Sequence, residues 1–336
     1  MSSRLFTIYK WSLFESIKSR RFLIVMVAYG LSIVMGMLAQ GLGSFKTTFA
    51  QASLLLHAVY SSGMWVTFAT VFGALILAVD AISGEREKRT LPLVLSQPIT
   101  RAEFIMGKSL AIITALCLAT ITAHVILILA AISIFQLTPP PDILSASLYC
   151  AIPGLLFATT VSSLSILFST LSRKTISALM ATLVFVIAIG PILNVCAPLI
   201  ASAIVGPPPE RPVQPGYVVI TNTSVNVSIP PIQPPESELV KEWKQWYSRY
   251  SAVRDAISAI SPFYHAEQCF HIVAFGASSS IEVSSFTEGN SSTEVSIDFA
   301  TIIDKTAPHL LALIVYTVVP FLLATVSFMK QEEAIA

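Results

Sequence analysis

The sequence predicts an all-α integral membrane protein with six transmembrane helices, an N-terminal interfacial helix and a small α+β extracytoplasmic domain between the fifth and sixth spans. Of its 336 residues, 54% are hydrophobic and only 12% are charged, and the mean hydropathy is +0.75. Soluble domains carry about 25% charged residues, so this composition excludes an ordinary soluble enzyme. The high apolar content also excludes a disordered chain, and the net charge of +1 is too balanced for a general nucleic-acid binder.

Six apolar stretches are long enough to cross a bilayer as helices, which takes about 20 residues. None of them contains Lys, Arg, Asp or Glu, and each must be helical because lipid offers the backbone no hydrogen-bond partner. The predicted spans are 22–39, 60–79, 110–135, 148–168, 176–205 and 310–329. They divide the chain into a membrane domain over 1–205, an extracytoplasmic loop domain over 206–308, and a last span with its tail over 309–336.

The charges of the loops set the predicted orientation. The N-terminal segment, the loops after the second and fourth spans, and the C-terminal tail together hold 13 Lys and Arg residues. The two short loops on the other side hold only Lys46. The loop 206–308 holds six more, but loops this long translocate largely regardless of charge. We therefore expect a multi-pass protein of the cell membrane with both termini in the cytoplasm.

The segment before the first span, residues 5–21, has an amphipathic pattern. Its apolar residues gather on one face of a helix with basic residues around them, which is typical of a helix lying in the cytoplasmic membrane interface. The predicted apolar face consists of Leu5, Ile8, Trp11, Leu13, Phe14 and Ile17. Such a helix is either a membrane anchor or a mechanical element, and the pattern does not choose between them.

The loop 206–308 combines proline-rich stretches, which favour stiff extended spacers, with strand and helix patterns. The segments 217–229, 281–286 and 295–299 are rich in β-branched residues or alternate in polarity, and they predict strands. Apolar residues spaced by four and three over 237–260 predict a helix. We expect this helix to pack on a short sheet or on the membrane surface; a partner-binding groove is the alternative.

The fifth span, 176–205, is too long for one straight crossing and contains Gly190-Pro191 and Pro198. Proline removes a backbone donor and kinks a helix. We expect the helix to break and continue as a short re-entrant piece near 192–205. Broken helices at membrane depth occur where they are buried in protein or line a cavity. Gly190 and Pro191 are therefore candidates for lining or sealing a pathway near the outer leaflet.

The segment 80–109, between the second and third spans, carries the most information, and we call it the elbow. A charged cluster over 85–89 ends one membrane helix, and a short apolar element follows over 91–95. Thr100 and Glu103 have the spacing of a capping box, which satisfies the first backbone N–H groups of a helix. The pattern predicts a rigid, charged hinge suited to docking another protein. The alternative is a positively charged, capped loop with no partner.

The elbow contains Ile82-Ser83-Gly84-Glu85-Arg86-Glu87, Thr90-Leu91, Leu93-Val94-Leu95-Ser96, Pro98-Ile99, Arg101 and Gly107-Lys108. This pattern resembles the type-2 permeases of ABC transporters, the six-span membrane subunits of the exporter class. It is most similar to the small permeases typified by the nitrous-oxide-reductase maturation system, and the six-span topology extends the resemblance over the chain. One departure is Arg89, which stands where many members of the family have glycine.

The resemblance implies that the elbow contacts a separate cytosolic ATP-binding subunit. It places seven residues in or near that contact: Glu85, Arg86, Glu87, Thr90, Pro98, Arg101 and Lys108. ATP would bind to the partner subunit. A P-loop-like run ending in Gly107-Lys108-Ser109 does not change this expectation, because it lacks the first glycine and continues directly into a membrane helix that uses its backbone N–H groups internally.

The third span places Cys117, Thr120 and His124 on one helical face. An ionisable side chain inside a span usually faces the bundle interior and marks a site, so this face is a second candidate for the pathway. The alternative is a histidine bonded to a neighbouring helix among small packing residues. Neither this group nor the His and Cys residues over 265–271 fits the spacing of a standard metal site, and we predict no bound metal.

These observations favour the permease subunit of an ABC transporter, an exporter, acting as a homodimer or pseudo-dimer in the lipid bilayer with a cytosolic ABC-type ATPase. A second permease copy is expected because a single six-helix bundle encloses too little space for a gated path. We expect no enzymatic activity, cofactor or nucleic-acid partner for the chain itself. One alternative is a membrane-anchored binding or assembly factor that works through 206–308, and another is an intramembrane enzyme that uses His124.

Overall fold

The computed structural model describes residues 3–42, 51–135, 141–209, 238–273 and 299–330. All regular structure in these ranges is helical. Six helical segments are long and apolar enough to cross a membrane, which confirms the predicted number of spans. They are Arg20–Leu38, Trp65–Glu87, Arg101–Ile134, Leu144–Leu171, Thr175–Val205 and Phe299–Lys330.

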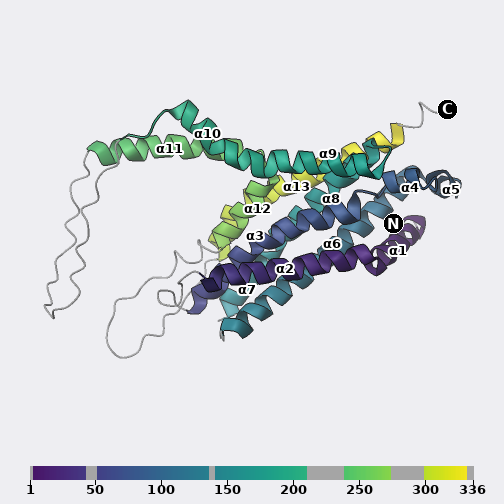
Figure 1. Ribbon diagram of the computed structural model, residues 1–336, viewed down its shortest axis with the longest axis horizontal. Helices are drawn as coiled ribbons and strands as arrows, with labels where there is room; N and C mark the ends of the chain where they lie inside the picture. Colours follow the sequence, from purple (N-terminus) through teal and green to yellow (C-terminus); the bar gives the residue numbers. More distant parts are fainter. Residues whose placement is uncertain (1–2, 43–50, 136–140, 210–237, 274–298, 331–336) are drawn as a thin grey trace. The chain divides into compact units, whose positions relative to one another are not determined.

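The helices follow one another as labelled in Figure 1. Those of the first half of the chain are α1 (Ser3–Lys18), α2 (Arg20–Leu42), α3 (Gln51–Ala78), α4 (Ser83–Glu87), α5 (Leu91–Leu95), α6 (Arg101–Phe135) and α7 (Pro141–Tyr149). Those of the second half are α8 (Ala151–Leu171), α9 (Thr175–Ile187), α10 (Leu193–Val205), α11 (Glu238–Ser258), α12 (Pro262–His271) and α13 (Phe299–Lys330).

The α+β domain predicted over 206–308 finds no support, because the described part of this segment is helical. The predicted strands at 217–229 and 281–286, and residues 295–298, lie outside the described residues. Phe299, predicted to end a strand, is instead the first residue of α13, which carries an apolar sequence into the sixth span. The predicted helix over 237–260 is confirmed as α11.

The chain divides into two compact units, residues 189–261 and the remainder. In the larger unit α2 packs on α3, α3 packs on α6 and α8, and α8 packs on α13. The side chains of α8, and those of α3 from Trp65 onward, are largely buried, whereas α2 and α13 expose apolar residues such as Leu31 and Leu311. Such exposure is compatible with lipid, whose chains are as apolar as leucine.

Small and hydroxyl-bearing residues allow these helices to approach one another closely. A Cβ atom added to Gly36 on α2 would lie 2.5 Å from the Cα of Ser62 on α3, so only glycine fits at this crossing. Between α8 and α13, the hydroxyl groups of Thr160 and Thr317 lie 2.9 Å apart and form a hydrogen bond. The bundle is therefore held by packing and interhelical hydrogen bonds, as expected for helices surrounded by lipid.

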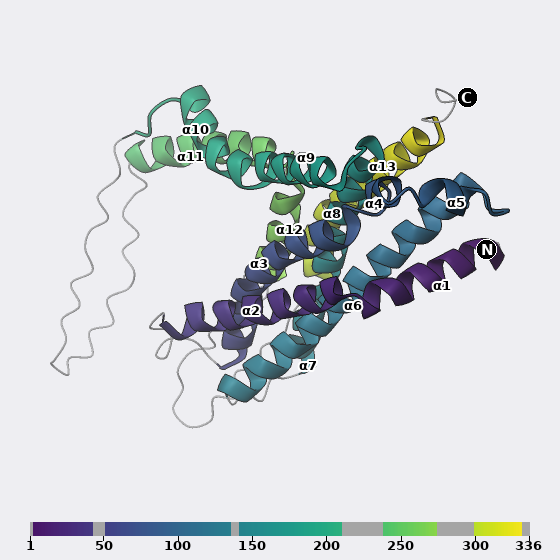
Figure 2. The same ribbon diagram turned by 45° about the vertical axis from the view of Figure 1, so that its right-hand side comes forward.

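The N-terminal helix α1 lies beside α6 (Figure 2). Its predicted single apolar face is wrong: Leu5 is buried and Ile8 is half-buried, while Trp11 and Phe14 are 62% and 60% exposed. The reason is that α1 has one side packed on α6, where a Cβ on Gly107 would lie 2.9 Å from the Ile8 side chain. The second, exposed apolar side is the one available to a membrane interface.

The short helix α12 is inserted among α3, α8 and α13. Its Phe263 ring meets the Phe157 ring of α8 edge to face at 4.8 Å, and its Phe270 ring lies parallel to the His124 ring of α6 at 6.4 Å. Both phenylalanines are buried. This part of the segment between the fifth and sixth spans thus belongs to the helical bundle rather than to a separate outer domain.

The fifth span is interrupted at the predicted Gly190-Pro191, but the chain stays helical through this point and Thr175–Val205 forms one candidate span rather than a span followed by a separate re-entrant piece. After α9 ends at Ile187, residues Ala188–Ile192 form a π-helix that contains Gly190 and Pro191, and α10 follows. Proline cannot donate to the helical ladder, and π-helical turns commonly mark such interruptions.

In the smaller unit α11 packs on α10 rather than on a sheet. The Trp246 indole N–H donates to the Gly206 carbonyl at 3.1 Å, which ties α11 to the end of α10.

Candidate functional site

The elbow consists of α4, α5 and the start of α6. The predicted capping box begins α6 as expected: the Thr100 backbone N–H donates to the Glu103 carboxylate at 2.9 Å, and the Glu103 N–H donates to the Thr100 hydroxyl at 3.2 Å. These reciprocal bonds satisfy two N–H groups that have no partner within the helix. They fix the direction in which the third span leaves the elbow.

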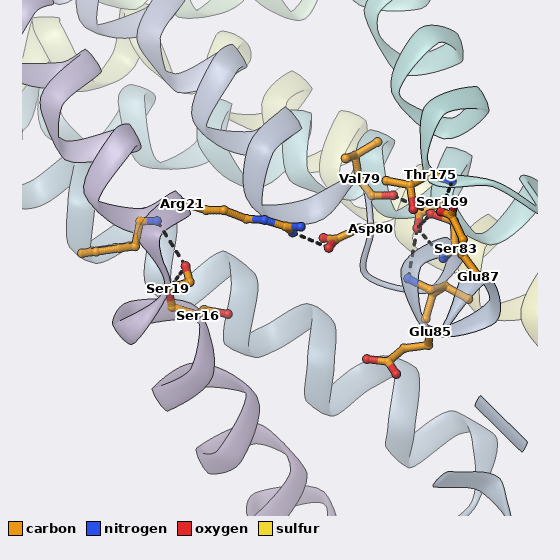
Figure 3. A network of polar contacts seen from close by, with 12 residues as sticks. Ser16, Ser19, Arg21, Val79, Asp80, Ser83, Glu85, Glu87, Ser169 and Thr175 are labelled. Atoms are coloured by element: carbon orange, nitrogen blue, oxygen red, sulfur yellow. Dashed lines mark hydrogen bonds and ion pairs between the residues drawn. The ribbon is translucent and has the colours of Figure 1, made fainter. Parts of the chain in front are cut away.

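The base of α4 is attached to the end of α8 through Ser169. The backbone N–H groups of Ile82 and Ser83 both donate to the Ser169 hydroxyl oxygen at 3.0 Å, and the two serine hydroxyls lie 3.1 Å apart. All three residues are fully buried. Figure 3 shows Ser83 and Ser169 side by side in this contact. Because a buried N–H without a partner is costly, Ser169 stabilises the turn by which the second span enters α4.

Arg86 and Glu87 of the elbow contact the junction between α8 and α9. One guanidinium nitrogen of Arg86, Nη1, donates to the carbonyls of Thr170 and Ser172 at 2.8 and 3.1 Å, at the C-terminal end of α8. The Glu87 carboxylate accepts the backbone N–H of Thr175, the first residue of α9, at 3.2 Å. Each charge is opposite to the partial charge of the helix end that it contacts. The cluster therefore joins the second span to the loop between the fourth and fifth spans.

Glu85 connects α4 to α6. Its carboxylate forms an ion pair with Lys108 and accepts a hydrogen bond from the Thr90 hydroxyl. The side chains of Glu85 and Lys108 are only 18% and 13% exposed. Enclosed pairs of this kind are much more sensitive to the loss of one partner than surface pairs are. Glu85 thus holds both ends of the elbow together.

Arg89, which follows the C-cap residue Lys88 of α4, has a left-handed conformation with φ = 58°. The Thr90 N–H donates to the Glu85 carbonyl at 3.0 Å and the Arg89 N–H donates to the Arg86 carbonyl at 3.1 Å. These two bonds define a Schellman motif, whose left-handed position favours glycine. The geometry explains why a glycine at this position suits the same turn.

We expect Arg89→Gly to stabilise the chain by about 1 kcal/mol, because a side chain at a left-handed position costs roughly that amount. The measurement is the thermal unfolding midpoint of the detergent-solubilised protein. Arg89→Ala is the matched control, since it also removes the charge but keeps a Cβ atom. An equal gain from both variants would show that the charge, and not the backbone conformation, carries the cost.

A second ion pair links the start of α2 to the end of the second span. The Arg21 guanidinium reaches across to the Asp80 carboxylate (Figure 3). Beside it, the Ser19 hydroxyl accepts the Phe22 N–H at 3.2 Å and donates to the Ser16 carbonyl at 2.7 Å. These bonds fix the corner between α1 and α2. The elbow is therefore supported from both sides, by α1 and α2 and by α8 and α9.

The outer surface of the elbow is formed by α5. Leu91 is buried against the rest of the unit, but Leu93 is 68% exposed, and Pro92 and Pro98 are exposed beside it. Leu93 therefore forms a rigid apolar projection. It lies between two prolines, and the rest of the elbow is held in place by ion pairs and buried hydrogen bonds. Such a projection is suited to a pocket on another protein, because it binds with little loss of conformational freedom.

The structure gives the seven predicted elbow residues different positions. Glu85, Thr90 and Lys108 form one contact, Arg86 and Glu87 form the contacts to α8 and α9, and Pro98 and Arg101 flank the start of α6. The supporting residues Arg21, Asp80 and Ser169 were not predicted from the sequence. Asp80, a carboxylate at the end of an apolar span, was a signal for an ion-pair partner. Ser169 gave no signal, because one serine in a run of small residues is ordinary.

The predicted pathway face of the third span is part of a buried hydroxyl network. The Tyr29 hydroxyl of α2 lies 2.9 Å from the Thr70 hydroxyl of α3 and 3.0 Å from the Thr120 hydroxyl of α6. Cys117 is half-buried on α6. Gly190 and Pro191 lie in the π-helix instead, and in sequence they belong to the start of the smaller unit. The Tyr29 hydroxyl therefore joins three spans by hydrogen bonds inside the bundle, with Thr120 as its partner on α6.

His124 is 1% exposed, and its Nδ1 lies 2.9 Å from the carbonyl of Thr120 in its own helix. Since a carbonyl only accepts, Nδ1 carries the proton and Nε2 is an acceptor, which has no hydrogen-bond partner among the described residues. The predicted alternative of a bond to a neighbouring helix is wrong, because the histidine bonds within α6. On α8, a Cβ on Gly154 would lie 3.0 Å from the imidazole ring.

No group of three or more His, Cys, Asp or Glu side chains suited to a metal ion occurs in the part of the chain that the structure describes. Of the outer candidates, His265 pairs with His309 at 3.0 Å between their Nδ1 atoms. Burial raises the pKa of the Cys269 thiol to about 12, and the thiolate is the form that binds metals. The geometry therefore offers polar contacts between helices rather than a metal centre.

A comparison with protein families matches the model of the ABC-2 family transporter proteins over residues 6–332, nearly the whole chain. A search of curated proteins returns no match. The family match agrees with the six apolar helices. The chain belongs to the ABC-2 family of transporter proteins, as a multi-pass membrane permease.

Proposed function

We propose that this chain is the permease subunit of an ABC exporter and that the elbow couples it to a separate cytosolic ATPase. The observation that carries the proposal is the geometry of α5, on which Leu93 projects from a base fixed to α1, α2, α6, α8 and α9. A push on α5 would move the second and third spans together, because Glu85–Lys108 connects the two ends of the elbow. Proteins of the ABC-2 family typically work with an ATPase partner.

The wider proposal includes two permease copies, as a homodimer or pseudo-dimer, with ATP bound on the partner subunits. The excess of basic residues on the elbow side supports a cytoplasmic location for the elbow and both termini, in the cell membrane. The elbow pattern also supports a relation to the small permeases of the nitrous-oxide-reductase maturation type. Export is inferred from this resemblance.

The experiment is affinity purification of the chain from its native membranes in mild detergent, followed by an assay of ATP hydrolysis. We expect a P-loop ATPase to co-purify in comparable amount. Leu93→Glu should remove most of that ATPase, because it places a charge in an apolar contact at a cost of several kcal/mol. Purification of the chain alone, without hydrolysis, would contradict the proposal.

Lys10→Glu is the matched control. It adds negative charge at an exposed position of a different helix, α1, and should leave the recovery of ATPase unchanged. Equal losses from Lys10→Glu and Leu93→Glu would attribute the effect to net charge. Size-exclusion chromatography of both variants verifies that they remain folded and monodisperse.

A further inference from the structure

A polar cavity of about 230 Å³ lies between α1 and the inner side of the elbow. Ser12 and Glu15 of α1, Arg21 of α2, and Asp80 at the end of the second span are among its lining residues. Lys88 and Lys108 line it from the elbow and α6. The cavity is smaller than the sites of drug-sized ligands, which occupy roughly 300–1,000 Å³. It is large enough for a compact polar group.

The charges in this cavity are balanced but not all are paired. Arg21–Asp80 and Glu85–Lys108 form ion pairs. Glu15 and Lys88 also line the cavity, with opposite charges, and the side chain of neither forms an ion pair or a hydrogen bond with another described residue. The cavity therefore presents one negative and one positive group to a ligand.

A buried hydroxyl group is a second, independent indication of a ligand. Ser12 is 3% exposed, and its Oγ has no hydrogen-bond partner among the described residues. A buried hydroxyl without a partner is unfavourable. The Arg21 guanidinium also keeps donors available, because it has five N–H groups and only Nη1 contacts Asp80. Ser12 and Arg21 are therefore additional donors for an oxygen-rich group.

The position of the cavity indicates where its ligand comes from. Leu77 near the end of the second span and Ile112 near the start of the third are among its apolar lining residues. At this level of the bundle the apolar spans give way to charged segments. Lipid headgroups lie at the same depth of a membrane. Trp11 and Phe14 on the exposed side of α1 are typical of a helix in this interface.

We propose that this cavity binds the headgroup of a phosphatidylethanolamine lipid. Glu15 receives the ammonium group, and Lys88 with Arg21 receives the phosphate. The phosphoethanolamine headgroup carries an ammonium group with N–H donors and a negatively charged phosphate. It therefore matches both the acidic Glu15 and the basic Lys88 side chains. A phosphatidylglycerol headgroup leaves Glu15 without a cation, and the quaternary ammonium of phosphatidylcholine has no N–H to donate.

The test uses the purified full-length chain, delipidated in mild detergent and exposed to equimolar phosphatidylethanolamine, phosphatidylcholine and phosphatidylglycerol with identical acyl chains. Native mass spectrometry counts the retained lipids. We expect one phosphatidylethanolamine retained about tenfold over the other two, the size of effect that charge-assisted hydrogen bonds provide. Glu15→Gln should remove the preference over phosphatidylcholine, and Lys88→Gln should lower the retention of phosphatidylethanolamine. Lys10→Gln, on α1 but not among the cavity's lining residues, should leave the preference intact.

Equal retention of the three lipids, a preference for phosphatidylglycerol, or a phosphatidylethanolamine preference insensitive to both cavity variants would overturn the proposal. Free phosphoethanolamine distinguishes the source of the headgroup. If it bound while the lipid did not, a soluble zwitterion would be the ligand and the lipid assignment would be wrong. If free phosphoethanolamine displaces the bound lipid only at a large molar excess, the result supports the lipid as the ligand.

Discussion

Glu85→Lys is expected to destabilise the chain by about 3 kcal/mol and to abolish its coupling to ATP hydrolysis. The substitution places two ammonium groups in a site where each side chain is less than one-fifth exposed. Removing one partner of an enclosed ion pair costs several kcal/mol, because the remaining charge is left uncompensated. The measurements are the thermal unfolding midpoint in detergent and the rate of ATP hydrolysis of the co-purified complex.

The control is the charge swap, Glu85→Lys with Lys108→Glu. It restores opposite charges across the same two positions, and we expect it to recover more than half of the lost stability and coupling. Recovery will be incomplete because Thr90 donates to the carboxylate of Glu85 in the native elbow. If the swapped protein behaved no better than the single variant, the pair would not connect α4 to α6 in the way described.

Arg86→Ala is expected to cost about 2 kcal/mol, because hydrogen bonds from charged donors contribute roughly 1.5–3 kcal/mol. It removes the donor to the Thr170 and Ser172 carbonyls at the end of α8. The loop between the fourth and fifth spans should then exchange its amide hydrogens faster, including that of Thr175, whose N–H contacts the neighbouring Glu87. Hydrogen exchange followed by mass spectrometry over residues 169–176 measures this loss.

Two further variants make the Arg86 experiment specific. Arg86→Lys keeps the charge but has no planar fork, and it should recover only part of the protection. Gln97→Ala changes an exposed residue of the same elbow and should shift the unfolding free energy by no more than about 0.5 kcal/mol. Protection of residues 169–176 unchanged in Arg86→Ala would refute the role of Arg86 at the α8–α9 junction.

Local rules predicted much of this fold. Apolar length predicted the six spans, Gly190-Pro191 predicted the interruption of the fifth, and Thr100 with Glu103 predicted the start of α6. Each of these features is determined within a few residues of sequence, by hydrophobicity, by a missing backbone donor or by a capping side chain. None of them requires knowledge of which helices are neighbours.

The contacts that organise the candidate site are of a different kind. Ser169 and Thr175 lie more than 80 residues from the elbow residues that they contact, and no periodic pattern marks them. The same limit explains the incorrect apolar face of α1: periodicity identified the apolar residues, but the packing of α1 on α6, with its close approach at Gly107, decided which of them became buried. Burial depends on the neighbouring helix, which the sequence of one helix does not contain.

The central claim, that α5 docks a separate ATPase, is tested most directly by photocrosslinking. Benzoylphenylalanine placed at Leu93, which is 68% exposed on α5, should crosslink in native membranes to a protein with a P-loop ATPase sequence. The same group at Leu31, on the apolar exposed side of α2, should not yield that product. An ATPase crosslink at position 93 and not at 31 is the predicted result, and crosslinking of position 93 only to lipid or to this chain itself would contradict the account.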